Sequence, residues 1–237
     1  MEEWAHGVAV GPSGLVHVVG ALGDDAFLRS FTATGSVAGA DRFRIGPDAR
    51  AWRVAAAGSA GAESVFVLGA AAAGTFVRRY DNGSAVATTF LQLGSDFVWQ
   101  DALGLAAGGD SVYVAGALGR PDGQRDAYVV RLDPSLAQLW ADVPRATGDD
   151  TALGVAVDGA GRARVVGSVG GDGFVRTYGP ASSTPLAAWR FGSAAGDEAT
   201  DAVVSGSALF VAGTTWGKFG GTTGKTGQDG FLARFGA

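Results

Sequence analysis

Short runs of alternating apolar and polar residues cover most of this chain, and almost none of it follows the 3.6-residue period of a helix. One strand-like run recurs five times, as DAFLRSF (25–31), GTFVRRY (74–80), DAYVVRL (126–132), DGFVRTY (172–178) and DGFLARF (229–235). Successive side chains of a strand point to opposite faces, so Phe174, Arg176 and Tyr178 share one face. Both faces carry bulk, which favours a strand packed on both sides.

The remaining pattern repeats with the same period. Each unit opens with an apolar strand of small residues, turns at glycine, serine or aspartate, and continues into a β-branched run that ends in glycine. A variable loop leads to the recurring strand, and a last strand follows in four units, at 40–46, 88–94, 138–143 and 188–192. The closing glycines stand roughly 46 to 51 residues apart, in the range of propeller blades, at Gly20, Gly69, Gly116, Gly167 and Gly213.

Four short strands per unit predict an all-β chain, a five-bladed β-propeller with four-stranded antiparallel blades. The last unit ends after its recurring strand, so we expect 19 strands and a last blade lacking its outer strand. A single domain is expected over residues 1–237, with blades near 1–48, 49–98, 99–148, 149–196 and 197–237.

The outer edge of residues 230–235 is therefore expected to be unpaired. A closed ring held by packing is the favoured interpretation. Alternatively, a strand added by another chain covers this edge, or the chain is a piece of a longer array.

Two segments carry a resemblance to a known family. FVAGTTWGKFGGTTGKTGQDGFLARFGA (210–237) and GDDTALGVAVDGAGRARVVG (148–167) resemble the bacterial SBBP-type β-propeller repeat family. The resemblance covers nearly the whole chain, implies the propeller fold and an extracytoplasmic or secreted location, and implies no shared active site. Unit two departs furthest from the repeat, because Gly74 stands in place of the opening aspartate and its first turn, 57–64, is longer.

Composition removes several classes of function. The net charge of −5 gives no basic surface for nucleic acid. With no cysteine and two histidines, no metal site or cofactor is expected. No apolar run approaches the roughly 20 residues of a membrane span, and residues 1–10 do not have the pattern of a signal peptide. The segment GGTTGKTG (220–227) lacks the spacing of a phosphate-binding P-loop.

Departures from a repeat are candidates for function. When the first strands are aligned, His6, Trp52, Arg53 and Asp201 replace small or aliphatic residues in two adjacent columns. In a closed ring these four residues would lie together at the mouth of the channel. Three interpretations stay open: an Arg53–Asp201 ion pair with packing around it, a ligand pocket with an aromatic wall, and His6 acting as a base oriented by Asp201.

Four further features lie outside these two columns. The loop 214–229 is the longest insertion and carries Trp216, Lys218 and Phe219, either as a lid over the mouth or as local packing. The aspartates that open the recurring strand are expected to accept backbone N–H bonds, and His17 is expected to be packed or at the surface. An acidic collar precedes the first strands and either attracts cations or a basic partner or caps the turns of a solvated rim, with Glu2, Glu3, Asp101, Asp149, Asp150, Asp197 and Glu198.

The sequence therefore predicts a non-catalytic module that binds a small molecule, a glycan, a peptide or another protein at the channel mouth. Catalytic signatures such as G-x-S-x-G are absent. The alternative is an enzyme, a small-molecule cyclase or lyase that uses the same mouth. A third possibility is a purely structural repeat within a larger surface protein.

Overall fold

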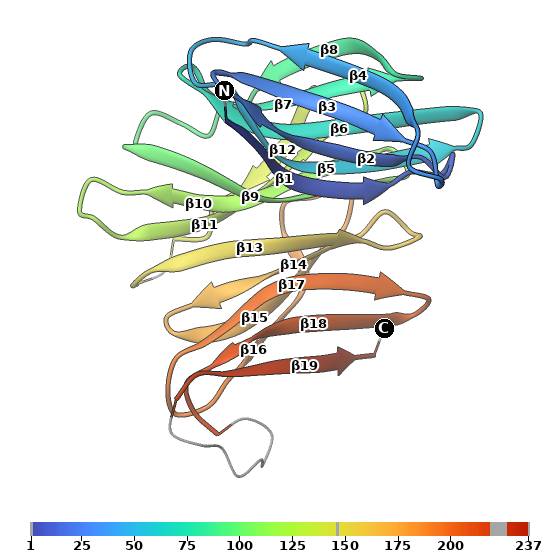
Figure 1. The fold of residues 1–237 in the computed structure, drawn as a ribbon. Helices are drawn as coiled ribbons and strands as arrows, with labels where there is room; N and C mark the ends of the chain where they lie inside the picture. Colours follow the sequence, from blue (N-terminus) through green and yellow to red (C-terminus); the bar gives the residue numbers. More distant parts are fainter. Residues whose placement is uncertain (1, 146, 219–226, 237) are drawn as a thin grey trace. The chain divides into compact units, whose positions relative to one another are not determined.

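The computed structural model describes residues 2–145, 147–218 and 227–236. Within them the chain forms nineteen β-strands (Figure 1), and no described segment is a helix long and apolar enough to cross a membrane. The strands make five antiparallel sheets in chain order, four with four strands and the last with three. The predicted fold class, a five-bladed β-propeller whose last blade is a strand short, is confirmed.

The sheets follow one another along the sequence. The first two contain β1 (Glu3–Val10), β2 (Val16–Leu22), β3 (Asp25–Phe31), β4 (Val37–Phe43), β5 (Arg50–Ser59), β6 (Ala62–Ala71), β7 (Gly74–Asp81) and β8 (Ser84–Phe90). The third contains β9 (Trp99–Gly108), β10 (Ser111–Gly119), β11 (Arg125–Leu132) and β12 (Gln138–Asp142). The last two contain β13 (Asp150–Val157), β14 (Ala163–Val169), β15 (Asp172–Tyr178), β16 (Pro185–Phe191), β17 (Asp197–Ser205), β18 (Ala208–Thr215) and β19 (Asp229–Phe235).

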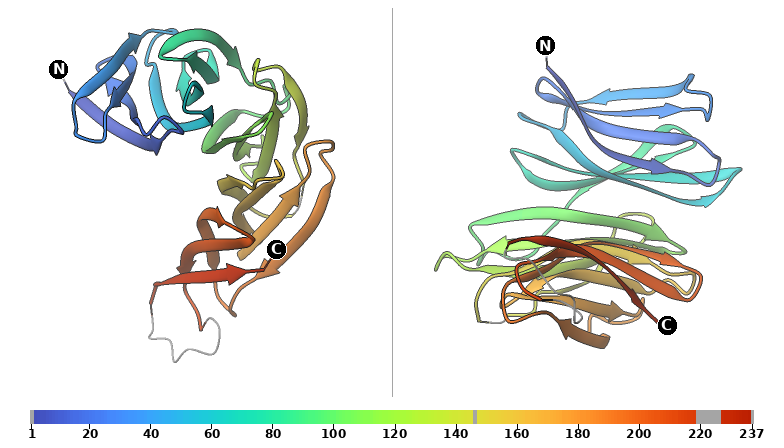
Figure 2. Two further views of the ribbon diagram at one scale, coloured as in Figure 1. Left: turned by 90° about the vertical axis from the view of Figure 1, so that its right-hand side faces the viewer. Right: turned by 60° about the horizontal axis from the view of Figure 1, so that its bottom comes forward.

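The chain divides into two compact units. Unit 1 is Met1–Leu93, Leu105–Val112 and Leu132–Gln138, and unit 2 is Gly94–Gly104, Tyr113–Arg131 and Leu139–Ala237. In unit 1 the first and second sheets lie side by side, blue to teal in Figure 2, and in unit 2 the fourth and fifth sheets do so, yellow to red. The residues of the third sheet are shared between the units. The single domain expected from the sequence stays a prediction.

The glycine that closes each β-branched run has a steric cause. A Cβ on Gly20 would overlap the carbonyl oxygen of Trp4 on the first strand and lie 2.8 Å from the ring of Phe27 on the third. The same pair of obstacles, a first-strand carbonyl and a third-strand aromatic ring, surrounds the corresponding glycines of the other four blades. The glycine and the aromatic residue of the recurring strand are therefore one packing feature, repeated five times.

Aromatic residues of the fourth strand join consecutive blades. In unit 1, Phe43 of β4 packs against Phe76 of β7 with ring centroids 6.1 Å apart. In unit 2, Phe191 of β16 packs against Phe231 of β19 at 5.7 Å. Edge-to-face packing of this kind adds stability beyond the area that it buries, so the same strand position connects neighbouring blades in both units.

Tyrosine hydroxyl groups make a second connection between blades. Tyr80 donates a hydrogen bond of 2.8 Å to Asp41 on the preceding sheet, and Tyr178 donates one of 2.7 Å to Asp142. Burial, reinforced by the neighbouring carboxylate, raises the pKa of both hydroxyl groups. Each tyrosine therefore stays protonated and acts as a donor.

Two local predictions need correction. The fourth strands begin earlier than expected, at Val37 and Ser84 in the first two sheets, and the Asn82-Gly83 turn before β8 has positive φ at both residues, which suits a two-residue hairpin. At Asp25 the expected backbone N–H bonds are replaced by hydrogen bonds from Arg42 and Arg44, at 2.7 and 2.6 Å.

Candidate functional site

The residues that break the repeat lie where the first strand of a sheet contains a β-bulge. In the first two sheets the pairing register shifts between Ala5 and Gly7 and between Ala51 and Arg53. The last two sheets have the same shift, between Ala152 and Gly154 and between Ala199 and Asp201. A bulge leaves one residue unpaired and re-aims its side chain. The residues in these four unpaired positions are His6, Trp52, Leu153 and Thr200.

In β1 and β13 the residue after the bulge is glycine. At this point the first strand of the following sheet approaches closely. A Cβ on Gly7 would lie 2.8 Å from the carbonyl oxygen of Trp52 and 3.1 Å from the Cα of Arg53. A Cβ on Gly154 would lie 3.0 Å from the Cα of Asp201. One member of each contact must be glycine, while the other can carry a long side chain. Arg53 and Asp201 occupy this second role, and both side chains are exposed.

Three of the predicted site residues lie together in unit 1. The rings of His6 and Trp52 are in contact, with centroids 4.5 Å apart and planes inclined by 47°. Arg53 donates a hydrogen bond of 3.1 Å to the carbonyl oxygen of Trp52. Burial, together with the positive charges of Arg50 and Arg53, lowers the pKa of His6. The imidazole is therefore neutral at pH 7, and its buried Nε2 has no hydrogen-bond partner among the described residues.

The positive charge beside this ring pair is not compensated locally. Within the described residues of unit 1, neither Arg50 nor Arg53 forms an ion pair with a carboxylate. The side chain of Arg53 is exposed and that of Arg50 is partly exposed. Guanidinium groups bind planar anions in a bidentate manner and stack on aromatic rings. The arrangement can therefore hold an anion next to an indole surface.

The other predicted site residues belong to unit 2. The carboxylate of Asp201 accepts a hydrogen bond of 2.8 Å from the adjacent backbone N–H of Ala202. The side chain of Trp216 is 47% exposed, and its backbone N–H donates to the carbonyl oxygen of Gly196 at 2.9 Å. Lys218 is exposed, and Phe219 lies outside the described residues. A common site formed by these residues and the three in unit 1 stays a prediction.

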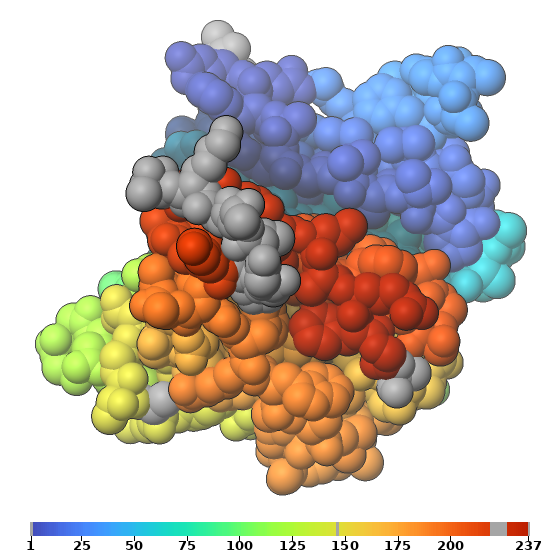
Figure 3. Space-filling view, turned by 90° about the horizontal axis from the view of Figure 1, so that it is seen from below, coloured from blue at the N-terminus to red at the C-terminus, as the bar shows by residue number. Residues whose placement is uncertain are grey.

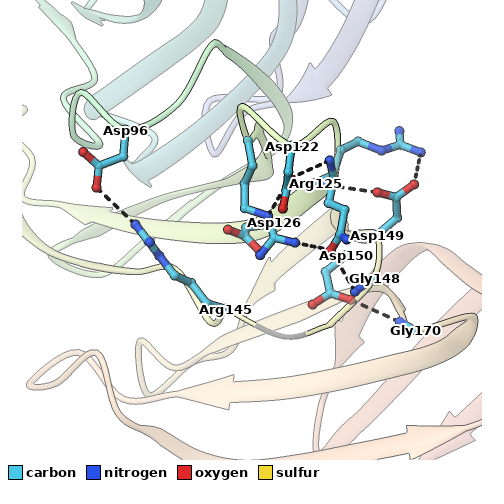
Figure 4. Close-up of polar contacts among 11 residues, drawn as sticks. Asp96, Asp122, Arg125, Asp126, Arg145, Gly148, Asp149, Asp150 and Gly170 are labelled. Carbon is cyan, nitrogen blue, oxygen red and sulfur yellow. Dashed lines mark hydrogen bonds and ion pairs between the residues drawn. The ribbon is translucent and has the colours of Figure 1, made fainter.

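The acidic collar is only partly a solvated rim. Asp150 is buried and accepts a hydrogen bond of 3.1 Å from the backbone N–H of Gly170, as Figure 4 shows. Asp149 next to it is paired with Arg125 at 3.6 Å. Burial raises the pKa of Asp150, with a further small contribution from the charge of Asp126. These carboxylates serve the packing and capping of loops, and the expectation of solvent exposure is wrong for Asp150.

Asp197 behaves in the same way before β17. It is 2% exposed and accepts hydrogen bonds from the backbone N–H and the hydroxyl group of Ser193, at 2.6 and 3.0 Å. This is a side-chain cap of the turn, which is the local role of aspartate in such loops. Among the described residues, no group of three or more histidine, aspartate or glutamate side chains is placed to hold a metal ion.

Sequence reasoning missed a buried polar cluster at the first blade. His17 is 2% exposed, and its Nδ1 lies 2.8 Å from the hydroxyl group of Ser30. Its Nε2 lies 2.9 Å from a carboxylate oxygen of Glu63 on the next blade, and Ser13 donates to the other oxygen through its N–H and hydroxyl group. The longer segment 57–64 of unit two was the available signal. The turn expected there is wrong, because β5 extends to Ser59 and β6 begins at Ala62, and the longer hairpin carries Glu63 on β6 to this position.

Solved structures similar to this chain include β-propellers. Hydrazine synthase of Kuenenia stuttgartiensis matches with a TM-score of 0.65 at 14% identity, over 98% of this chain and 62% of that one. The Dos1 propeller matches with a TM-score of 0.59 at 14% identity, over 89% and 54%. A neuraminidase-like protein from A/bat/Guatemala/164/2009 matches with a TM-score of 0.51 at 11% identity, over 87% and 66%.

The similarity concerns the fold alone. No protein-family model matches the sequence, and no curated protein does. This chain spans less than two thirds of the length of each of the three solved chains. A propeller serves many unrelated functions, so a function has to be argued from the site residues of this chain.

Proposed function

We propose that this chain is a β-propeller module that binds an anionic ligand at His6, Trp52 and Arg53 without acting on it chemically. The observation that carries the proposal is the pair Arg50 and Arg53, which have no carboxylate partner among the described residues of unit 1 and lie beside the His6–Trp52 ring pair. A ring packed on the indole, with a carboxylate or phosphate near Arg53, would use both features. The ligand class is an acidic glycan, an acidic peptide or a small ring-containing acid.

A second part of the proposal concerns unit 2. We propose that Asp201, Trp216, Lys218 and Phe219 also contribute to ligand binding. Support comes from the 47% exposure of Trp216, because an exposed indole is a common anchor for ligands. Loss of ligand affinity in Trp216→Leu tests this part separately.

A small-molecule lyase or cyclase at the same residues is the second candidate. The lowered pKa of His6 favours it, because a neutral imidazole at pH 7 can accept a proton. A catalytic base is normally oriented by a hydrogen bond from a further group. Among the described residues of unit 1, His6 has no such bond, and for this reason binding is the preferred function.

The repeat and the free sheet edge lead to two further proposals. We propose membership of the SBBP-type bacterial repeat family and a location outside the cytoplasm, supported by the glycine and aromatic pair present in all five blades. We also propose that another chain adds a strand at β19. Within the described residues β19 pairs only with β18, Leu232 is 73% exposed, and the strand, red in Figure 3, lies at the surface. An exposed edge of this kind is a template for strand pairing.

Calorimetric titration with glucuronate, an acidic sugar, tests the binding proposal. Arg53→Gln removes the exposed charge and Trp52→Leu removes the ring, and each variant should weaken binding about tenfold or more, the effect of losing one charge-assisted contact. Trp189→Leu, which removes an exposed indole from β16, is the matched control and should bind as the wild type does. Equal affinity of wild type and Arg53→Gln for glucuronate contradicts the proposal.

The enzyme alternative can be tested by analysing the glucuronate in the same titration samples. Conversion of glucuronate to an unsaturated or cyclic product by the wild type, and its loss in His6→Gln, would replace the binding proposal by a lyase or cyclase. Recovery of unchanged glucuronate from the wild type supports a module that binds without catalysis.

A further inference from the structure

A cavity of about 320 Å³ lies in unit 2 between the turn that joins β13 to β14 and the turn that joins β17 to β18. Three charged residues line it, Asp158, Arg162 and Arg164. An apolar wall faces them, formed by Val204, Ala208 and Leu209, and the remaining lining is glycine, alanine and serine. A cavity of this size is at the lower end of the range for small-molecule sites.

The charges that line this cavity do not balance. One oxygen of Asp158 accepts hydrogen bonds from both guanidinium groups, at 2.7 Å from Arg162 and 3.2 Å from Arg164. Its other oxygen accepts the backbone N–H groups of Ala160 and Arg162, both at 3.0 Å. Burial acts against ionisation, but these hydrogen bonds lower the pKa of Asp158 below its ordinary value. One carboxylate is therefore shared by two cations, which leaves an excess of one positive charge.

Arg164 is the less accessible of the two cations. Its side chain is 8% exposed, and it donates a hydrogen bond of 3.0 Å to the hydroxyl group of Thr177. Its Nε has no hydrogen-bond partner among the described residues. A buried guanidinium that is only partly compensated is costly, so an additional anion in the cavity would be stabilised by it.

In the first blade, the strand position that corresponds to Arg164 is occupied by His17, and it has a carboxylate partner. His17 lies opposite Ala9 on its sheet as Arg164 lies opposite Ala156. There a single carboxylate, that of Glu63 from the neighbouring blade, faces a single imidazole. In unit 2 the residues of the β17–β18 turn that line the cavity, Gly206 and Ser207, carry no charge. Among the described residues, the neighbouring blade therefore supplies no carboxylate to this cavity.

We propose that this cavity binds a small carboxylic acid. The carboxylate pairs with the guanidinium groups of Arg162 and Arg164, and a short apolar chain packs against Val204, Ala208 and Leu209. A free acid and the C-terminal residue of a peptide present the same carboxylate. The site is separate from the ring pair of His6 and Trp52, and the inference does not depend on it.

Titration with butyrate and with butyramide, followed by amide chemical shifts, tests this site. Butyrate should shift the amide signals of residues 158–162 and 204–209, while butyramide, of the same shape without the charge, should bind about tenfold more weakly or worse. N-acetyl-leucine and its amide form the second pair, and tighter binding of N-acetyl-leucine than of butyrate would point to a peptide C-terminus as the source. Equal affinity for butyrate and butyramide overturns the proposal.

Variants locate the binding. Ser207→Glu places a carboxylate on the β17–β18 turn and should abolish butyrate binding, whereas Ser207→Gln, of matched size, should retain it. Arg162→Gln should weaken butyrate about tenfold, with Arg125→Gln as the control because Arg125 is a partly exposed arginine of the same unit. Arg53→Gln should leave butyrate binding unchanged, which separates this site from the one in unit 1. Wild-type affinity in both Ser207→Glu and Arg162→Gln would overturn the proposal.

Discussion

The hairpins β1–β2 and β13–β14 have the same turn and use the same strand position for a buried polar residue, with different consequences. In the first blade His17 is held by Glu63, which is 46 residues away and belongs to the next blade. In the fourth blade Arg164 is held by Asp158, six residues away in its own turn. A carboxylate from a neighbouring blade connects two sheets, while a local carboxylate stabilises one turn and leaves the space beyond it open.

The two turns also differ at their first residue, and this difference decides whether a carboxylate from another blade can enter. Gly11 and Asp158 begin the same turn, since each donates its N–H to the residue four positions on. A Cβ on Gly11 would lie 2.6 Å from the carboxylate carbon of Glu63. Glycine in the first blade therefore admits the carboxylate of another blade, whereas aspartate in the fourth blade provides its own.

The largest expected effect comes from removing the carboxylate that joins two blades. Glu63→Ala leaves His17 and Ser13 without their partner in a buried position, and the free energy of unfolding should fall by about 3 to 5 kcal/mol. Urea unfolding measures this change. Glu3→Ala, which breaks the half-exposed pair with Arg29, should cost less than about 1 kcal/mol. Equal losses in the two variants would show that Glu63 does not join the blades energetically.

A smaller effect is expected where the first strands touch. Gly7→Ala places a methyl group 2.8 Å from a carbonyl oxygen and Gly154→Ala places one 3.0 Å from a Cα, so both should destabilise the protein, by about 1 to 3 kcal/mol. Gly7→Ala should have the larger effect, because its nearest obstacle is closer. Gly39→Ala on β4 meets no atom within 4 Å and is the control. If all three variants had the unfolding free energy of the wild type, the close approach of neighbouring first strands would be contradicted.

The smallest expected effect is a change in the free energy of unfolding at acidic pH. Burial alone would raise the pKa of Glu63, but hydrogen bonds from Ser13 and the interaction with His17 lower it below its ordinary value of 4.5. A carboxylate with a lowered folded-state pKa stabilises the fold above its ordinary pKa, and this contribution is lost as the pH falls through the ordinary value toward the folded one. The difference in unfolding free energy between wild type and Glu63→Gln should therefore shrink below pH 4.5.

The pH dependence of the contribution of Asp158 to stability can be compared with that of Glu63. Its pKa is lowered from an ordinary value of 3.8, so the contribution of Asp158 should persist to lower pH than that of Glu63. Urea unfolding of wild type, Glu63→Gln and Asp158→Asn between pH 7 and pH 3 compares the two. A difference between wild type and Glu63→Gln that is constant over this range would contradict the ionised state of Glu63.

The sequence predicted the recurring features of the fold well, because each depends on near neighbours. Gly20 and Phe27 are seven residues apart and belong to one hairpin, so their pairing repeats wherever the hairpin does. His6, Trp52 and Arg53 were also recognisable, because they interrupt columns of small residues. The ring contact of His6 and Trp52 was not predicted and depends on the close approach of consecutive first strands.

Other contacts could not be predicted, because they depend on how strands, loops and neighbouring blades pack together. For Glu63 the sequence gave only an indirect sign, the greater length of the segment 57–64. The partners of Asp25 are Arg42 on β4 and Arg44 just after it, in the same blade, while local turn chemistry had suggested backbone N–H groups. The burial of Asp150 and Asp197 depends on how the loops pack above the sheets, which the hydrophobic pattern does not record.

From the sequence by itself came the all-β class, the order of nineteen strands and the shortened fifth sheet. The physical reason is that side-chain alternation and turn residues act locally, and five copies of one pattern reinforce each other. Only the tertiary structure decided which carboxylate meets which cation. Those pairings depend on the close approach of neighbouring blades, where a glycine or a longer hairpin determines whether a side chain enters or a cavity remains.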